Sequence, residues 1–578
     1  MIPVRFTEQA YGTYKASEAG VHIRSHGRPG VSQVFRLTGI ARGSRLTSKP
    51  RGGPDDGQHG VAQSECPFRD TQEGEVEMQK FRLSLGAALV VLLMMPVTAS
   101  AVPPSVDEAT ATFDYTKNMH PLGFSPNPVP LDNSTPGQGV FNSDLAFWGD
   151  VGVQGTYSGF RLIDIEEPDN PVELVDWTEC TSPTSTTGNQ GDVIIWGDLV
   201  IRSWNTGTPA PRYPDGTIIP VTDPARFTTP GAFCGDWPMF REPADPPAPE
   251  RGQEGVHIID ISDPANPDVI GFVDIPCGSH TETLVPDLAN NRLLVYSNPS
   301  ANTFLGGTQP GEEPFNCRGF DIVEVPLADP AAASYLRFVP TGHPDTPPEE
   351  LHPCHDTGVI LGDAMKASCA GGSGPTVWSL DPADGGALDD PMFMFHRDLG
   401  TSIGHTAAWS WDGEVLIFGH EPGGGGQAQC QATSSVLNRT LFFLDGETGE
   451  TLGEFLHPRP QTATENCTWH NLNVVPTDKG YIGVSGNYQS GISVFDFTDP
   501  ENTEEIAYAD PAPLVNPNNP AGIELGGDWS TYWYNGLIYE SDITRGLIIW
   551  RLSDKAVAGA RKLSHSNPQT QEFTIDLK

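Results

Sequence analysis

Positively charged residues are scarce in this sequence. Its 578 residues include 33 Lys and Arg against 74 Asp and Glu, which gives a formal net charge of −41 at pH 7. So acidic a surface repels phosphate groups, and no basic cluster interrupts it in residues 102–578. We therefore exclude nucleic acids and anionic membrane surfaces as partners.

The common catalytic motifs are also absent. The sequence has no Gly-x-Ser-x-Gly, no His-Glu-x-x-His, no Gly-x-Gly-x-x-Gly ahead of a helix and no EF-hand loop. The glycine run from Gly423 to Gly426 is not a phosphate-binding loop, because no Lys followed by Ser or Thr comes after it. We therefore expect a binding protein in preference to an enzyme.

Long apolar runs are missing, except for one near residue 90. Leu83 to Met95 is too short to span a bilayer, follows a short basic stretch and precedes an Ala-x-Ala site that ends at Ala101. We read residues 78–101 as a secretory signal peptide and residues 1–77 as a disordered upstream extension from a misassigned start codon. The alternative is a long disordered extension on a membrane-anchored protein.

The mature chain, residues 102–578, would then be secreted to the extracellular space or the periplasm. No second apolar stretch of spanning length follows residue 101, so we expect no stable membrane span after cleavage of the signal.

From about residue 144 the sequence repeats one unit seven times. The sixth copy shows it best: four short strands, rich in β-branched and aromatic residues, separated by turns rich in Gly, Pro, Asn and Asp. Repeats of this length and composition predict an all-β, seven-bladed β-propeller of four-stranded antiparallel blades. The blades begin near residues 144, 192, 280, 355, 405, 470 and 528. Two stacked sandwiches are the alternative, but the even phasing of the copies argues against them.

We also predict how the ring closes. Residues 119–126 are expected to supply the outer strand of the last blade, since the chain after Leu552 has a helix-like pattern from Ala556 to Leu563.

The third strand of each copy carries the clearest signature. Gly159 to Ile165 and Gly255 to Ile261 both run into turns with paired Asp, Asn and Pro residues. This pattern resembles the LVIVD-repeat propellers, a family of mostly secreted or surface bacterial proteins, over roughly residues 119–555. The resemblance implies the fold and a location outside the cytoplasm, and it implies little about activity.

The cysteines indicate a disulfide framework on one face. Eight remain after Cys66 is set aside, an even number in a chain with an export signal. In a propeller, all eight precede a first strand, end a second strand or lie between strands two and three, so they gather at the upper rim. Pairing in chain order closes the shortest loops: Cys180–Cys234, Cys277–Cys317, Cys354–Cys369 and Cys430–Cys467. Thiolate metal ligation is the less favoured alternative.

The long insertions fall on the same upper face. They are residues 203–254, 298–318 and 422–437. Insertions that occur on one face and are held by disulfides are typical of a binding surface. Our first hypothesis is therefore a secreted scaffold that binds an extracellular protein, peptide or polymer through these loops. Trp237, Trp469 and Trp529 are candidates to line the mouth of the channel.

A second hypothesis comes from the first position of each blade, near the mouth of the central channel. Four consecutive blades place histidine there, and the other three place aspartate: His280, His355, His405 and His470, with Asp144, Asp192 and Asp528. His352, His420 and Glu421 are expected on the same face. Converging imidazoles and carboxylates suit copper, zinc or iron. The alternative to the scaffold is thus a metal-binding propeller or a metalloenzyme such as an oxidoreductase.

The same histidines have a purely structural interpretation. A side chain at this position can hydrogen-bond the backbone of the next blade and join the blades together. The sequence establishes no cofactor, and it leaves both interpretations open.

Overall fold

The structure is a computed structural model and describes residues 104–128, 141–181, 190–205, 207–220, 222–241, 252–299, 317–347, 350–516 and 522–578. The expected extension (1–77) and signal peptide (78–101) lie outside these residues, as does most of the 298–318 insertion. In the part of the chain that is described, no helix is long and apolar enough to cross a membrane.

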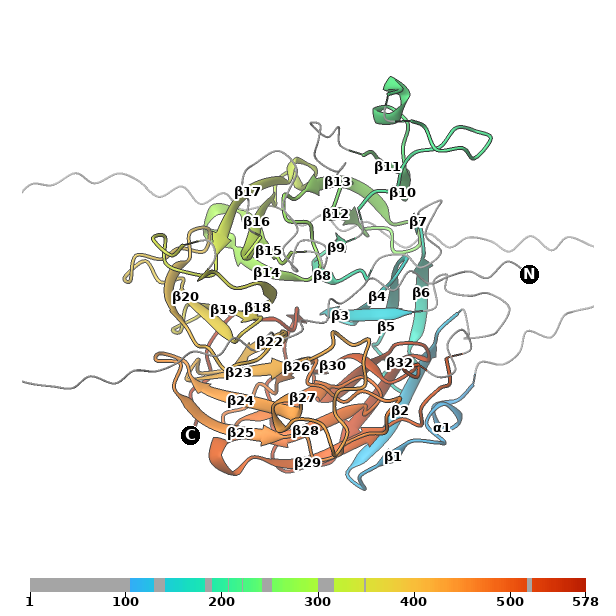
Figure 1. Ribbon diagram of the computed structural model, residues 1–578. Helices are drawn as coiled ribbons and strands as arrows, with labels where there is room; N and C mark the ends of the chain where they lie inside the picture. The colour runs from blue at the N-terminus through green and yellow to red at the C-terminus, as the bar shows by residue number, and fades with distance from the viewer. Residues whose placement is uncertain are drawn as a thin grey trace, which may run out of the picture. The chain divides into compact units, whose positions relative to one another are not determined.

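Seven sheets of four antiparallel strands surround a common axis, which confirms the predicted fold class (Figure 1). The innermost strands are β3 (Asn142–Trp148), β8 (Val193–Trp196), β14 (Glu282–Asp287), β18 (Cys354–Ile360), β22 (Gly404–Trp409), β26 (Asn471–Val474) and β30 (Asp528–Tyr534). The second strands are β4 (Val151–Thr156), β9 (Leu199–Trp204), β15 (Arg292–Ser297), β19 (Lys366–Gly371), β23 (Val415–His420), β27 (Ile482–Gly486) and β31 (Leu537–Asp542).

The outer half of each blade completes the sheet. The third strands are β5 (Gly159–Asp164), β12 (Gly255–Asp260), β16 (Gly319–Pro326), β20 (Pro375–Ser379), β24 (Thr440–Asp445), β28 (Ile492–Asp496) and β32 (Gly546–Leu552). The outermost strands are β6 (Val172–Trp177), β13 (Asp268–Asp274), β17 (Ser334–Pro340), β21 (Met392–His396), β25 (Thr451–Leu456), β29 (Glu504–Asp510) and β2 (Met119–Pro126).

The ring closes where it was predicted to close. Strand β2, from the start of the described chain, pairs antiparallel with β32 and sets Met119 opposite Leu552 (Figure 1). The short helix α1 (Val106–Ala109) precedes it, and β1 (Asp114–Tyr115) extends blade six beyond β29. Hydrogen bonds between the two ends of the ring resist opening of the blades.

The predicted helix from Ala556 to Leu563 is wrong. The chain forms turns there, and Gly559 adopts a φ of +85°, which interrupts a helix. The chain then enters the channel as β33 (His565–Ser566) and β34 (Thr570–Gln571).

This C-terminal segment closes the lower end of the channel. Strand β33 pairs with β3 of blade one, and β34 pairs with β18 of blade four. Between them, Asn567 accepts a hydrogen bond from Ile195 N at 2.8 Å and donates one to Ile195 O at 3.0 Å. The segment thus ties together innermost strands that are distant in the sequence.

The hydrophobic core lies between neighbouring blades. Val484 of blade six packs in one cluster with Trp533 and Ile548 of blade seven, and all three are buried. Both faces of a blade are therefore apolar, which explains the near-continuous runs of aliphatic and aromatic residues in the strands.

The insertion of blade two forms a small sheet of its own outside the ring (Figure 1). It consists of β7 (Cys180–Thr181), β10 (Ala232–Cys234) and β11 (Trp237–Met239), and Cys180 lies opposite Cys234. The described part of the insertion projects from the edge of the propeller.

Candidate metal centre

Bulges in the innermost strands position two of the four predicted histidines. In β18 the pairing passes from Cys354 to Asp356, and in β22 it passes from Gly404 to Thr406. His355 and His405 are the extra residues. An extra residue in a strand turns its side chain out of the regular alternation, and bulges of this kind are frequent next to functional sites.

The four histidines do form the predicted arc. The distances between adjacent ring centroids are 4.9 Å for His280–His355, 4.3 Å for His355–His405 and 3.8 Å for His405–His470. His405 and His470 are buried, and the other two are half-buried. Four blades thus contribute one continuous group of imidazoles.

Three of the four rings contact the backbone of the next blade. Nδ1 of His470 lies 2.6 Å from the carbonyl oxygen of Trp529. The backbone of His405 likewise raises the pKa of the His355 ring, and the backbone of His470 raises that of the His405 ring, so these rings also contact the next blade. A carbonyl accepts only from an N–H, so His470 carries its proton on Nδ1 and keeps a lone pair on Nε2. This is the arrangement of metal-binding histidines, and it also links the blades as the structural interpretation requires.

All four imidazoles are neutral at physiological pH. Burial lowers the pKa of His280 to about 4 and that of His470 to about 3. Burial, together with the adjacent imidazoles, also holds the pKa values of His355 and His405 well below 6.5. The neutral ring is the form that binds a metal ion.

Glu421 completes the group. It follows the last residue of β23, and one ligand atom from each of His355, His405 and Glu421 lies within 4.8 Å of the others. Among the described residues, this is the one set of three or more His, Cys, Asp or Glu side chains so close together. Two imidazoles and a carboxylate with neighbouring His470 form a nitrogen and oxygen ligand set suited to zinc, copper or iron.

The carboxyl group of Glu421 is protonated without a cation. Burial raises its pKa to about 8, and the hydroxyl of Tyr488 donates a hydrogen bond to its Oε1. A positive ion at this position would offset the cost of ionising the buried carboxylate.

Two of the other predicted residues are engaged elsewhere. His420 has its Nδ1 2.9 Å from Leu437 O, and its Nε2 accepts from Ser402 N at 3.2 Å. His352 stacks on His396 of β21 at 3.9 Å between ring centroids. The structure brings neither side chain into the group around Glu421.

The aspartates belong to a different layer from the histidines. In β30 the pairing passes from Asp528 to Ser530, so Trp529 matches His355 and His405. Asp528 instead lies beside Glu540 within blade seven. Asp144 accepts hydrogen bonds from Ser530 and Tyr532, so it lies one position further along the channel than the histidines. Sequence spacing could not show this, because a bulge shifts the register by one residue.

A buried acidic cluster occupies that second layer. Asp192 lies beside Asp144. Glu282 and Asp356 are also close enough for the charge of Asp144 to raise their pKa values. Burial raises the pKa of Glu282 to about 8 and holds the pKa values of Asp192 and Asp356 well above 3.8. Burial thus favours the protonated form of each of these three carboxyl groups.

A small pocket on the axis joins the two layers. Residues from several blades and from the C-terminal segment line it: His280, His405, Asp144, Asp192, Trp529 and Gln569. Gln569 donates to Asp144 Oδ2 at 3.3 Å, and so the C-terminal segment forms the floor of the pocket. Trp529 therefore lines the pocket as expected, whereas Trp469 is fully buried in the core between blades.

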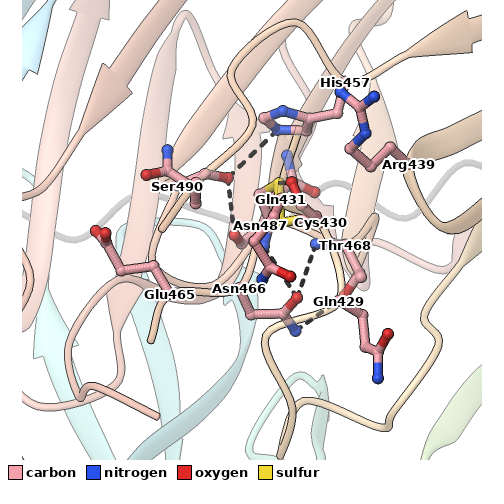
Figure 2. The surroundings of a disulfide bond; sticks show 12 residues. Gln429, Cys430, Gln431, Arg439, His457, Glu465, Asn466, Thr468, Asn487 and Ser490 are labelled. Carbon is pink, nitrogen blue, oxygen red and sulfur yellow. Dashed lines mark hydrogen bonds between the residues drawn. A yellow bond between two sulfur atoms is a disulfide. The ribbon is translucent and has the colours of Figure 1, made fainter. Parts of the chain in front are cut away.

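The expected cysteine pairs lie at bonding distance. Four disulfides join Cys180–Cys234, Cys277–Cys317, Cys354–Cys369 and Cys430–Cys467. Figure 2 shows the last of these, where Asn466 Oδ1 accepts from the N–H groups of Cys467 and Thr468 at 3.0 and 3.3 Å. Cys277, Cys354 and Cys467 each stand just before a histidine of the arc, so three disulfides fix segments that position imidazoles.

No protein-family model matches the chain, and no curated protein matches its sequence. Membership of the LVIVD-repeat family is therefore not shown. The chain is similar in structure to the β-propeller domain of Cps50 (Swd1) from Myceliophteria thermophila, at 9% identity and a TM-score of 0.39, over 74% of this chain and 100% of that one.

Two further solved structures are similar to a comparable degree. A chain of the mitotic checkpoint complex has 10% identity and a TM-score of 0.38, covering 76% of this chain and 96% of its own. A protein from Lactobacillus plantarum has 11% identity and a TM-score of 0.38, covering 75% and 97%.

Proposed function

We propose that this protein is a secreted metal-binding propeller of the LVIVD-repeat type, and that it holds one transition metal ion at the upper end of its channel. The observation that carries the proposal is the meeting of His355, His405 and Glu421 within 4.8 Å, with His470 beside them. The sequence alone favoured the scaffold. The position of Glu421 changes that preference, because it adds an anionic ligand that a histidine chain between blades does not need.

Three further features support a metal ion at this place. The imidazoles are neutral, and the Nδ1–H of His470 is fixed by a backbone carbonyl, which directs Nε2 away from that carbonyl. The carboxyl group of Glu421 is buried, and no cationic side chain lowers its pKa. The disulfides and the signal pattern support an oxidising compartment, where paired cysteines leave the nitrogen and oxygen ligands to bind metal.

Elemental analysis tests the proposal. The untagged mature chain, exported through its own signal, should contain about one zinc, copper or iron ion per molecule, or take one up on incubation with the separate salts. His355→Ala and His405→Ala should each lose the ion. His352→Ala is the matched control, because that histidine is partly buried yet outside the group, and it should keep the ion.

A wild-type chain without metal after reconstitution would contradict the proposal. So would equal retention of the ion by all three variants. In either case the arc would serve as hydrogen-bonded linkage between blades.

A second function is favoured by the blade-two insertion. Ile218 and Phe233 are 51% and 45% exposed on this disulfide-held projection. An apolar patch on a surface projection marks a site for a partner, and Ile218 and Phe233 are candidates for such a patch. We propose that the insertion binds an extracellular protein; Phe233→Ser should abolish a partner's binding without any effect on metal content.

A further inference from the structure

Tyr488 has a strained backbone beside the proposed metal site. Its φ is +51°, in the left-handed region that bulky residues rarely adopt. Two hydrogen bonds hold it there: Tyr488 N to Asp528 O at 3.1 Å and Asp528 N to Tyr488 O at 2.8 Å. Strain of this kind persists where the surrounding structure enforces it, and it clusters at functional sites.

The phenol of Tyr488 is directed at the metal-binding group. Its hydroxyl donates a hydrogen bond to Oε1 of Glu421, and its ring centroid lies 4.2 Å from that of His470. The residue is only 5% exposed. A phenolic oxygen therefore lies within hydrogen-bonding distance of the carboxylate that we assign as a ligand.

The glycine-rich loop closes over this phenol. A Cβ atom on Gly425 would lie 2.5 Å from the hydroxyl oxygen of Tyr488, and Gly425 has a φ of +68°. Only glycine fits this position without displacing either the loop or the phenol. The loop that the sequence shows as a run of four glycines thus covers the Tyr488–Glu421 pair.

We infer that Tyr488 is a ligand of the same ion and binds it as a phenolate. This inference rests on the proposed metal site. When the ion binds, the proton of the Tyr488 phenol and the proton of the Glu421 carboxyl group both leave to solvent, and the two oxygen atoms bind the metal in their place. The resulting set of two imidazoles, one carboxylate and one phenolate is rich in hard anionic oxygen, which favours an oxidised ion, Fe³⁺ or Cu²⁺, over Zn²⁺.

Metal content and visible absorption, measured on the same samples, test the inference. The metal-free mature chain is incubated with Fe³⁺ or with Cu²⁺ and freed of excess ion. The wild type should hold about one ion and show an intense visible band from phenolate-to-metal charge transfer. Tyr488→Phe should lose that band while keeping most of the ion. Tyr296→Phe is the control: this hydroxyl of blade three donates a hydrogen bond to Leu388 O of blade four, and the band should remain.

Resonance Raman spectra of the wild type make the test independent of any variant. Excitation in the band should enhance the ring modes of a coordinated tyrosinate. A loaded wild type without the band, or a band unchanged in Tyr488→Phe, would overturn ligation by Tyr488 and leave the metal site standing. A wild type that takes up neither ion would overturn ligation by Tyr488, and one that also takes up no zinc would overturn the metal site.

Discussion

Cys430 is joined to Cys467 by a disulfide that connects the loop after Glu421 to the segment before His470 (Figure 2). The two cysteines are separated by 37 residues, and their Cα atoms are 5.6 Å apart. The bond thus links the two chain segments that carry Glu421 and His470. Its contribution to the site is positional, because neither sulfur belongs to the group around Glu421.

Replacing both cysteines by serine should weaken metal binding. We expect the dissociation constant of the ion to rise roughly 10- to 100-fold, as it does when groups that orient ligands are removed. The free energy of unfolding should fall by roughly 2–5 kcal/mol. Competition with a chelator of known affinity measures the first quantity, and denaturant unfolding measures the second.

The Cys180–Cys234 disulfide offers a matched control. It holds the blade-two insertion, away from the histidine arc. Its removal should cost stability to a similar degree and leave the metal affinity unchanged. An equal loss of affinity in both double variants would show that the effect is general loosening.

The buried pair Asp528 and Glu540 should make the protein less stable in mildly alkaline solution. Burial raises the pKa of Glu540 from its ordinary value of 4.5 to about 7, and it also raises the pKa of Asp528. Between these two values the folded state binds more protons than the unfolded state, so the free energy of unfolding falls as pH rises from 4.5 to about 7. In Glu540→Gln this decrease should be smaller, by an amount on the order of 3 kcal/mol.

Urea unfolding of the metal-free protein at a series of pH values checks this. Glutamine keeps an acceptor for the indole N–H of Trp550, which Glu540 accepts at 2.6 Å. Glu504→Gln, at an exposed position of β29, should leave the slope of the wild type unaltered. A slope that Glu540→Gln does not change would mean that other buried carboxyls govern the pH dependence.

The architecture could be predicted from the sequence because each blade repeats the same local signals. Turn residues, alternating strands and the Gly159 to Ile165 pattern recur along the copies. The closing strand Met119–Pro126 was predicted because the chain after Leu552 offers no strand pattern, although that segment forms turns and not the expected helix. The cysteine pairs followed from the face on which propeller loops lie. These are properties of a repeating unit, and a single sequence contains many copies of it.

The site was only partly predictable because its geometry depends on departures from the repeat. The bulges at His355 and Trp529 shift the register by one residue. The comparison of the repeats could not show this shift, so it wrongly aligned Asp528 with the histidines. Tyr488 reaches Glu421 across 67 residues through a backbone conformation that no propensity indicates. The C-terminal segment with Asn567 has no counterpart in the repeat. The sequence pattern therefore gave no indication that this segment enters the channel.

Asn567 should be important for the closure of the channel from below. Its side chain is 3% exposed and bonds both the N–H and the carbonyl of Ile195. In Asn567→Ala those two buried backbone groups lose their partner, and the free energy of unfolding should fall by roughly 2–4 kcal/mol. Asn502→Ala, at an exposed turn, should be nearly neutral. Equal stability of the two variants in urea would mean that the C-terminal segment is not held in the channel in solution.

Gly425 and Gly426 are adjacent, and alanine at the two positions should have opposite outcomes. At Gly425 a Cβ would meet the hydroxyl of Tyr488 at 2.5 Å, and the positive φ adds backbone strain. At Gly426 the nearest atom to a Cβ is Gly423 O at 3.8 Å, an ordinary contact. Gly425→Ala should therefore displace Tyr488 from Glu421.

The expected result for Gly425→Ala is weaker metal binding and a reduced visible band in the Fe³⁺ or Cu²⁺ form, while Gly426→Ala retains both. The comparison is specific because both variants add one methyl group to the same glycine run. If Gly425→Ala bound the ion as tightly as the wild type with an unaltered band, the loop would have room to move away from the phenol. The contact between Gly425 and Tyr488 would then have no part in positioning the ligand.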